Sequence, residues 1–271
     1  VVPFENEEVN ECWIADRDRF SYEALNSDER LTKPMLKQGG EWKEVDWQTA
    51  LEYVANGLQQ IKSNHGANSI GALVSPHSTV EELYLAGKLV RGMGSENIDY
   101  RLRNAEFTAA QGVQWLGLPI AALSNLQSAL VVGSNLRKDN PLFAQRIRQA
   151  AKKGCKVFAI NDRVYDWALP VNASVVAAGD WAQALADVAA AVAEAKGVTA
   201  PVAGQVHDEA KAIAAALLAG EQKAVLLGNA AAHHAQASAL LALASWVAEQ
   251  TGAAVGYLTE AANTVGAQWV K

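Results

Sequence analysis

Apolar positions along the chain recur with two periods, one typical of amphipathic helices and one of buried strands. Residues 47–61 carry apolar side chains at spacings of three and four behind a candidate N-cap, Asp46, which predicts an amphipathic helix. The continuous apolar run at 69–75 predicts a buried strand. Residues 79–94 predict a helix that starts on a threonine and ends in glycines.

The same alternation continues towards the C-terminus. The segment TAPVAGQV at 199–206 is typical of a linker between two groups of elements. Apolar strands that alternate with helices are typical of a parallel sheet with helices on its faces, so the sequence predicts an α/β fold. The predicted strands are 128–133, 156–161, 223–228 and 253–258, and the predicted helices begin near Pro141 and cover 179–195, 207–219 and about 233–251.

Residues 1–45 follow neither period for more than a few positions and predict an extended arm. Residues 1–46 contain twelve acids and six bases, whereas the rest of the chain contains seventeen of each, so the net charge of −6 lies entirely in this segment. Aromatic residues beside charge are a composition that interfaces favour. The alternative is that these rings pin the arm to its own sheet. The six aromatic residues of 1–47 are Phe4, Trp13, Phe20, Tyr22, Trp42 and Trp47.

Composition argues against several classes of function. The negative charge disfavours a nucleic-acid partner, because binding to phosphates depends on Lys and Arg. The two cysteines, Cys12 and Cys155, are 143 positions apart without a CxxC motif, which disfavours a protein-ligated metal or iron–sulphur site within the chain. The uncharged run at 224–248 has the length of a membrane span, but polar residues interrupt it, so we predict a strand and a helix without direct membrane insertion.

A glycine turn, Gly133-Ser134-Asn135, follows the predicted strand at 128–133. Such a turn exposes backbone N–H groups at the edge where open α/β sheets bind ligands, and Asp162 and Arg163 follow the next strand, where a Rossmann-type sheet holds a ribose. The turn has one glycine and matches neither the dinucleotide fingerprint nor a P-loop. An ordinary turn and a nucleotide site both remain open from spacing alone.

Several phrases resemble the molybdopterin oxidoreductase family. They are GSN, the proline at 141, AKKG, FAINDR and SVVAAGDWAQAL, followed by KAVLLG, TGAAVG and TEAANTVGA. In that family the corresponding stretch holds one guanine dinucleotide arm of the molybdenum cofactor. The resemblance implies an α/β fold with parallel sheets flanked by helices in two lobes, with an extended N-terminal arm. It further implies a discontinuous lobe, 46–120 with 205–271, in which strand 223–228 pairs with 69–74, and an inserted Rossmann-like lobe, 121–204.

Within that family, residues 8–35 and the phrase NPLFAQRIRQAAKKG most resemble the large iron–sulphur subunits of bacterial NADH:quinone oxidoreductases, respiratory complex I. This resemblance implies that the chain is part of a longer subunit, with residues 1–45 leading to an upstream domain that carries iron–sulphur clusters. It also implies partners among the other subunits of the peripheral arm of the complex. The expected location is the cytoplasmic side of the bacterial inner membrane, within a membrane-bound complex that carries electrons from NADH towards quinone.

Departures from the family pattern shape the functional prediction. The neighbourhood where family enzymes commonly carry the molybdenum ligand, about 101–107, has Arg103 and Asn104 and no thiol. We therefore predict a structural and interaction domain with no activity of its own, no catalytic or metal-binding residues and no cofactor. Its vestigial site would comprise Gly133, Ser134, Asn135, Asp162 and Arg163. The alternatives are a fragment of a formate dehydrogenase-like enzyme that uses molybdopterin guanine dinucleotide, and a free-standing nucleotide-binding module.

The adjacent histidines His233 and His234 are the remaining candidates for chemistry. Neighbouring helical positions point about 100° apart and rarely share one metal ion. We predict that both lie at a helix N-terminus that faces solvent.

Overall fold

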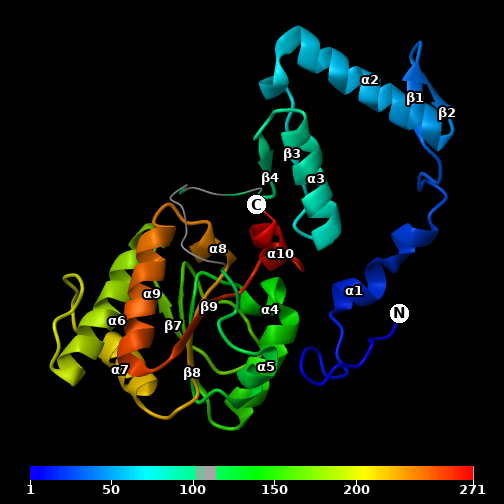
Figure 1. Ribbon diagram of the computed structural model, residues 1–271. Helices are drawn as coiled ribbons and strands as arrows, with labels where there is room; N and C mark the ends of the chain where they lie inside the picture. The colour runs from blue at the N-terminus through cyan, green and yellow to red at the C-terminus, as the bar shows by residue number, and fades with distance from the viewer. Residues whose placement is uncertain (102, 104–105, 107–113, 271) are drawn as a thin grey trace.

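The computed structural model describes residues 1–101, 103, 106 and 114–270, and its centre is a parallel five-stranded sheet (Figure 1). The strand order is β7-β6-β5-β8-β9, so the order reverses between β5 and β8. The strand bounds are β5 (Ser128–Val132), β6 (Lys156–Asn161), β7 (Asn172–Val175), β8 (Lys223–Leu227) and β9 (Ala254–Tyr257). Open α/β sheets bind ligands at such a reversal, outside the carboxyl ends of the strands.

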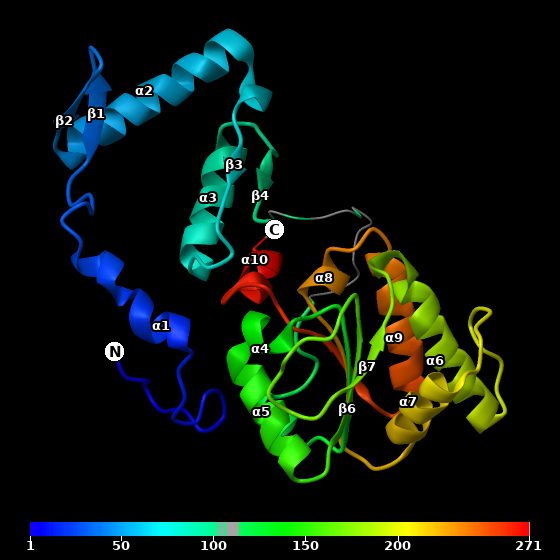
Figure 2. The same ribbon diagram turned by 180° about the vertical axis from the view of Figure 1, so that it is seen from behind.

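Helices cover both faces of this sheet. Alternate residues of β5 point to opposite faces: Leu130 and Val132 pack against one layer of helices, and Ala129 and Val131 against the other. The first layer is α6 (Trp181–Lys196), α7 (Asp208–Leu218) and α9 (Ala237–Thr251), and the second is α4 (Leu136–Asp139) and α5 (Pro141–Lys152) with the 3₁₀ turn η3 (Ile120–Asn125) (Figure 2). The predicted α/β fold with a parallel sheet flanked by helices is confirmed.

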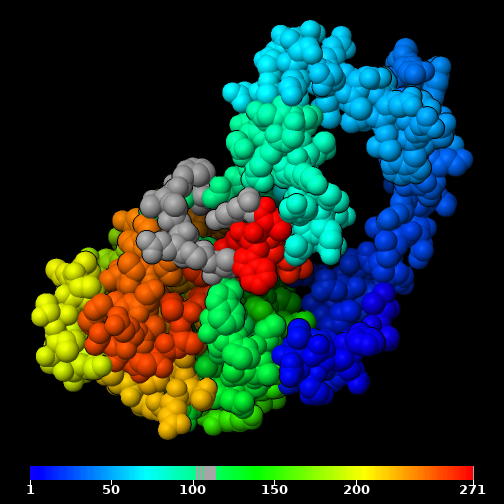
Figure 3. All heavy atoms as spheres, viewed as in Figure 1, coloured from blue at the N-terminus to red at the C-terminus, as the bar shows by residue number. Residues whose placement is uncertain are grey.

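Most of residues 12–101 extends away from this sheet domain, which comprises residues 114–270, whereas the N-terminal end of the chain lies against it (Figure 3). Asp46 caps α2, accepting a hydrogen bond from the Thr49 N–H at 2.7 Å, as predicted. Strand β3 pairs in parallel with β4, but it is two residues long, shorter than the predicted strand at 69–75. The elements of this region are α1 (Asp16–Phe20), η1 (Ser21–Asn26), β1 (Met35–Gln38), β2 (Glu41–Glu44), α2 (Trp47–His65), η2 (Ala67–Ser69), β3 (Ala72–Leu73), α3 (Val80–Gly92) and β4 (Ile98–Asp99).

The expected pairing of strand 223–228 with 69–74 is wrong. Strand β8 pairs with β5 over five residues, from Ser128↔Lys223 to Val132↔Leu227, and every residue of β8 is buried. The predicted linker at 199–206 does not lead out of the domain, because the Gln205 N–H donates to the Asp187 carboxylate of α6 at 2.7 Å. Residues 205–258 therefore extend the sheet that residues 128–175 begin.

The last helix joins the two regions. After β9, the chain forms α10 (Thr264–Trp269), which packs against α3. The N–H of Asn263 donates to the Pro76 carbonyl at 3.0 Å, and its side-chain amide donates to the Ser78 carbonyl at 2.8 Å. Among the described helices, none combines the length and the apolar character that crossing a bilayer requires.

Candidate functional site

The turn after β5 is closely packed. Gly133 has φ +65°, in the left-handed region that favours glycine. A Cβ at this position would lie 2.7 Å from the backbone nitrogen of Ala231 and 2.7 Å from the ring of Trp181. Glycine is required here both by the backbone conformation and by the approach of two other segments.

The backbone N–H groups of the turn all have partners within the chain. Gly133 N–H donates to the Ile160 carbonyl at 2.9 Å, which continues the β5–β6 ladder. Ser134 N–H donates to the side-chain oxygen of Asn161 at 2.9 Å, and Asn135 N–H donates to the Asp139 carboxylate at 2.9 Å. The donors that a phosphate would need at this turn are therefore committed.

Two side chains hold the turn in this state. Asn161, which is 2% exposed, also donates from its amide nitrogen to the Ser134 carbonyl at 3.1 Å, so it pairs with both backbone groups of that residue. The Asp139 carboxylate also lies 3.3 Å from the Ser134 hydroxyl. A carboxylate at this place repels an incoming anion. It also occupies the hydrogen-bond donors of the turn that the anion would need.

The predicted ribose-binding residues interact with each other instead. Arg163 donates to one oxygen of Asp162 at 2.9 and 3.0 Å, and the Tyr165 hydroxyl donates to the other at 2.9 Å. The hydrogen bond from Arg163, followed by that from Tyr165, holds the pKa of Asp162 below its ordinary value. The carboxylate is thus ionised at neutral pH, and both of its oxygens are engaged.

The crevice between β5 and β8 is filled by direct contact of the two turns. Gly228 follows β8, and a Cβ on it would clash with the Gly133 carbonyl oxygen and with Ser134. The Ala230 N–H donates to the Gly133 carbonyl at 3.1 Å. The turn predicted from the sequence therefore lies at the carboxyl edge of the sheet, as expected. The turns after β5 and β8 are in direct contact and leave no space between them for a ligand.

Comparison with known proteins shows the family to which this sequence belongs. The model of the molybdopterin oxidoreductase family matches residues 30–270. The chain belongs to the molybdopterin oxidoreductase family.

Curated relatives from this family have oxidoreductase names. The chain is 31% identical over 176 residues to a Staphylococcus aureus (strain MRSA252) protein named "Putative formate dehydrogenase", and equally to "Probable oxidoreductase YjgC" of Bacillus subtilis (strain 168). Each match covers 62% of this chain and 18% of the relative. The chain thus matches less than a fifth of the length of these relatives.

Solved structures agree at the level of the fold. Acetylene hydratase from Pelobacter acetylenicus superposes with a TM-score of 0.51 and 17% identity, covering 68% of this chain and 26% of the hydratase. The formyltransferase/hydrolase complex of Methylorubrum extorquens superposes with a TM-score of 0.55 and 20% identity, covering 83% of this chain and 61% of the matched chain. These identities are low, so the likeness concerns the fold alone.

The family description implies a molybdopterin cofactor in related proteins, and the described residues of the Gly133 turn do not fit the phosphates of such a group. Its phosphates would meet the Asp139 carboxylate and N–H donors that already have partners. At the position of the expected metal ligand, Arg103 forms an ion pair with Glu260, and Asn104 lies outside the described residues. Of the two cysteines, Cys12 lies in the N-terminal arm and Cys155 is buried before β6.

The prediction that His233 and His234 lie at a solvent-facing helix N-terminus is wrong. They lie between α8 (Asn229–Ala232) and α9. His233 Nε2 is 3.0 Å from Glu260, and the ring of His234 packs 5.6 Å from that of Trp181. As expected, the two rings point to different partners. The described residues contain no cluster of His, Cys, Asp and Glu suited to a metal ion.

His233 faces a cavity of about 640 Å³ between the sheet domain and the α3 region. Burial, followed by the charge of Arg103, lowers the pKa of His233 below its ordinary value. Glu260 lies close to His233 and also pairs with Arg103. A lowered pKa favours the neutral imidazole, whose Nε2 is within hydrogen-bond distance of Glu260. Sequence reasoning missed this cluster because Glu260 lies 27 positions from His233.

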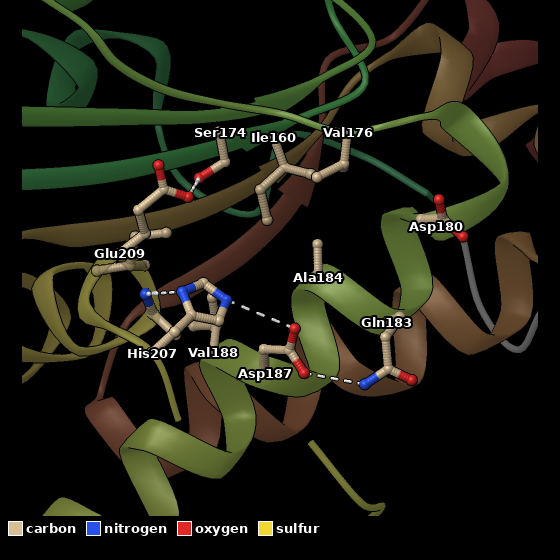
Figure 4. Close-up of a pocket in the computed structure, with 12 residues that line it drawn as sticks. Ile160, Ser174, Val176, Asp180, Gln183, Ala184, Asp187, Val188, His207 and Glu209 are labelled. Atoms are coloured by element: carbon tan, nitrogen blue, oxygen red, sulfur yellow. Dashed lines mark hydrogen bonds and ion pairs between the residues drawn. The ribbon is translucent and has the colours of Figure 1, made fainter. Parts of the chain in front are cut away.

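A smaller cavity of about 150 Å³ lies beside α6 and α7 (Figure 4). His207 caps α7, accepting from Ala210 N–H at 3.4 Å, and its other nitrogen is 3.5 Å from Asp187. Glu209 accepts a hydrogen bond from the Ser174 hydroxyl at 2.9 Å. These contacts join α7 to α6 and to β7, which indicates a structural role.

Proposed function

We propose that this chain is a non-catalytic structural and interaction domain of the large iron–sulphur subunit of a bacterial NADH:quinone oxidoreductase, respiratory complex I. The observation that carries the proposal is the closed turn at Gly133. Its N–H groups donate to Ile160, Asn161 and Asp139, so the family fold is kept while the phosphate-binding donors serve the fold itself. In this proposal electrons pass through iron–sulphur clusters in an upstream part of the subunit, and this chain holds no cofactor.

Exposed apolar surface supports the interaction role. All nineteen residues of α2 are described, and none of them is buried, although its apolar stripe has the pattern of a core-facing helix. Trp47 and Leu51 are 69% and 61% exposed, and Leu85 and Leu89 of α3 are exposed as well. Trp47 and Leu51 are four positions apart and so lie on one face of α2. Exposed apolar side chains on one helix face are typical of sites of protein association. The proposed partners are other subunits of the peripheral arm, on the cytoplasmic side of the inner membrane.

A second candidate is a fragment of a formate dehydrogenase-like enzyme that uses molybdopterin guanine dinucleotide. The names of the curated relatives favour it over the first candidate. The closed turn and the Arg103–Glu260 pair support a domain without a bound cofactor, which is the part of the first candidate that the second lacks.

Metal and nucleotide analysis of the full-length protein separates the two candidates. We expect iron without molybdenum, and no guanine nucleotide released by acid treatment. Stoichiometric molybdenum together with a guanine nucleotide would establish the second candidate instead. An Asn161→Ala variant analysed in parallel indicates whether any nucleotide found depends on this turn.

A further inference from the structure

Residues 6–11 form a short closed loop, called the strap here, that lies against the sheet domain near α5 (Figure 1). The Asn6 N–H donates to the Glu11 carbonyl at 2.9 Å, and the Glu11 N–H donates to the Asn6 carbonyl at 2.7 Å. This bridge gives the strap a defined shape within an arm that is otherwise mostly exposed.

Arg146 of α5 holds the strap through polar contacts. Its guanidinium donates to the carbonyls of Glu7 at 2.6 Å and Val9 at 3.0 Å, and it lies 3.4 Å from the Glu11 carboxylate. It also donates to the Ser124 hydroxyl of η3 at 3.3 Å. The Arg146 side chain is 5% exposed. Burying a charged guanidinium is unfavourable unless it is hydrogen-bonded and paired, and removing one of its partners destabilises the protein.

Glu11 is the centre of the contact from the strap side. Its φ is +53°, a left-handed conformation that non-glycine residues rarely adopt because it costs free energy. Such a conformation persists only where the surrounding structure holds it. Its carboxylate accepts from the Gln149 amide at 2.9 Å and from the Trp13 indole N–H at 3.2 Å, besides the Arg146 contact. A strained acid residue and a buried arginine on another element thus meet at one point.

Apolar burial contributes little to this attachment. Phe4 is 93% exposed, and Val9 and Trp13 are exposed as well. Ala15, by contrast, is buried, but its side chain is small. Among the described residues, the hydrogen bonds between the strap and the sheet domain are those of Arg146 and Gln149.

We propose that Ser124, Arg146 and Gln149 form a docking site for an acidic peptide turn, and that the strap occupies this site in cis. The site donates hydrogen bonds to two backbone carbonyls and one carboxylate of the turn. The several N–H donors of a guanidinium suit such a set of acceptors. Docking sets the position of Trp13, since its indole N–H donates to the same carboxylate. The inference concerns the attachment of the arm and does not depend on the function proposed above.

A nitroxide label on Cys12 of the full chain tests this site. Cys12 is exposed and directly follows Glu11, whereas Cys155 is buried and its thiol has a pKa raised by burial to about 11, so the label reports on the strap. We expect a restricted spectrum in the native chain and a several-fold increase in mobility in Arg146→Ala. The matched control is Arg148→Ala, which removes a half-buried arginine of the same helix that donates to the Ala168 carbonyl at 3.0 Å, and which leaves the spectrum restricted.

A second variant keeps the test decisive if Arg146→Ala does not fold. Glu11→Ala changes only the strap side, leaves the sheet domain intact, and is expected to release the label in the same way. Equal mobility of the label in native, Arg146→Ala and Glu11→Ala chains of unchanged circular dichroism would overturn the docking site. If Glu11→Ala is the only variant that folds, a label spectrum unchanged from that of the native chain would also overturn the docking site.

Discussion

Strand β5 in the sheet domain is buried at all five positions, whereas Leu73 of β3, in the N-terminal region, is 63% exposed. Both are apolar strands in parallel pairs, and both precede helices. The difference lies in what covers them: helices pack on both faces of β5, while β3 belongs to a two-stranded sheet. Parallel sheets normally have both faces covered, so the N-terminal elements are those of an α/β unit whose packing is incomplete among the described residues.

The largest difference is expected from truncating one leucine in each region, a buried one in the sheet domain and an exposed one in α2. Leu130→Ala removes a fully buried side chain and should lower the free energy of unfolding by about 2–5 kcal/mol. Leu51→Ala removes an exposed side chain from α2 and should change it by less than about 0.5 kcal/mol. Urea unfolding followed by circular dichroism measures both. Similar losses for the two variants would mean that α2 is buried in solution.

A pair of glycine substitutions sharpens the same contrast. Gly133→Ala forces a side chain into a positive-φ turn and against Trp181, so we expect a loss of about 1–3 kcal/mol or more. Gly57 lies inside α2 with no atom near its missing Cβ, so Gly57→Ala should stabilise α2 by about 0.5–1 kcal/mol. Thermal unfolding of the two variants measures this, and a harmless Gly133→Ala would show that the turn is looser than described.

The Asn161 amide is expected to stabilise the closed turn. Asn161→Leu leaves the N–H and carbonyl of Ser134 without these partners in a buried place, which should cost about 1–3 kcal/mol. Hydrogen exchange at Ser134 should become faster in this variant than in the native chain. Unchanged protection of that amide would indicate another acceptor.

The smallest effect concerns pH. Because the pKa of His233 is lowered in the folded state, the unfolded chain takes up a proton first as the pH falls below about 6.5, and stability declines there. His233→Gln should flatten this part of the stability curve. Unfolding midpoints measured between about pH 7 and pH 5 compare the two proteins, and identical slopes would contradict the assignment.

Much of the sheet domain could be predicted because its signals are local. The apolar runs of β5, β6 and β8 and the glycine turn each depend on a few adjacent residues, as does the Asp46 cap of α2 in the N-terminal region. The pairing of β8 with β5 could not be predicted in this way, because it joins strands that are far apart in the sequence and depends on how the whole domain packs.

The state of the candidate site was also beyond sequence reasoning. The sequence predicts a turn at Gly133, but the closure of that turn depends on Asn161, which is 27 positions from Ser134. The pairing of Glu260 with both Arg103 and His233 likewise joins distant segments. Side-chain contacts across a sheet edge leave no periodic signal in the sequence.

The most direct test of the central claim is an amide NMR titration of the chain with guanosine diphosphate. The account predicts that the Gly133, Ser134 and Asn135 amides keep their chemical shifts at millimolar nucleotide, and that the Ser134 amide exchanges slowly, because each already donates within the chain. Saturable shift changes at these three amides would contradict it, since they would show that the turn still offers its donors to a phosphate.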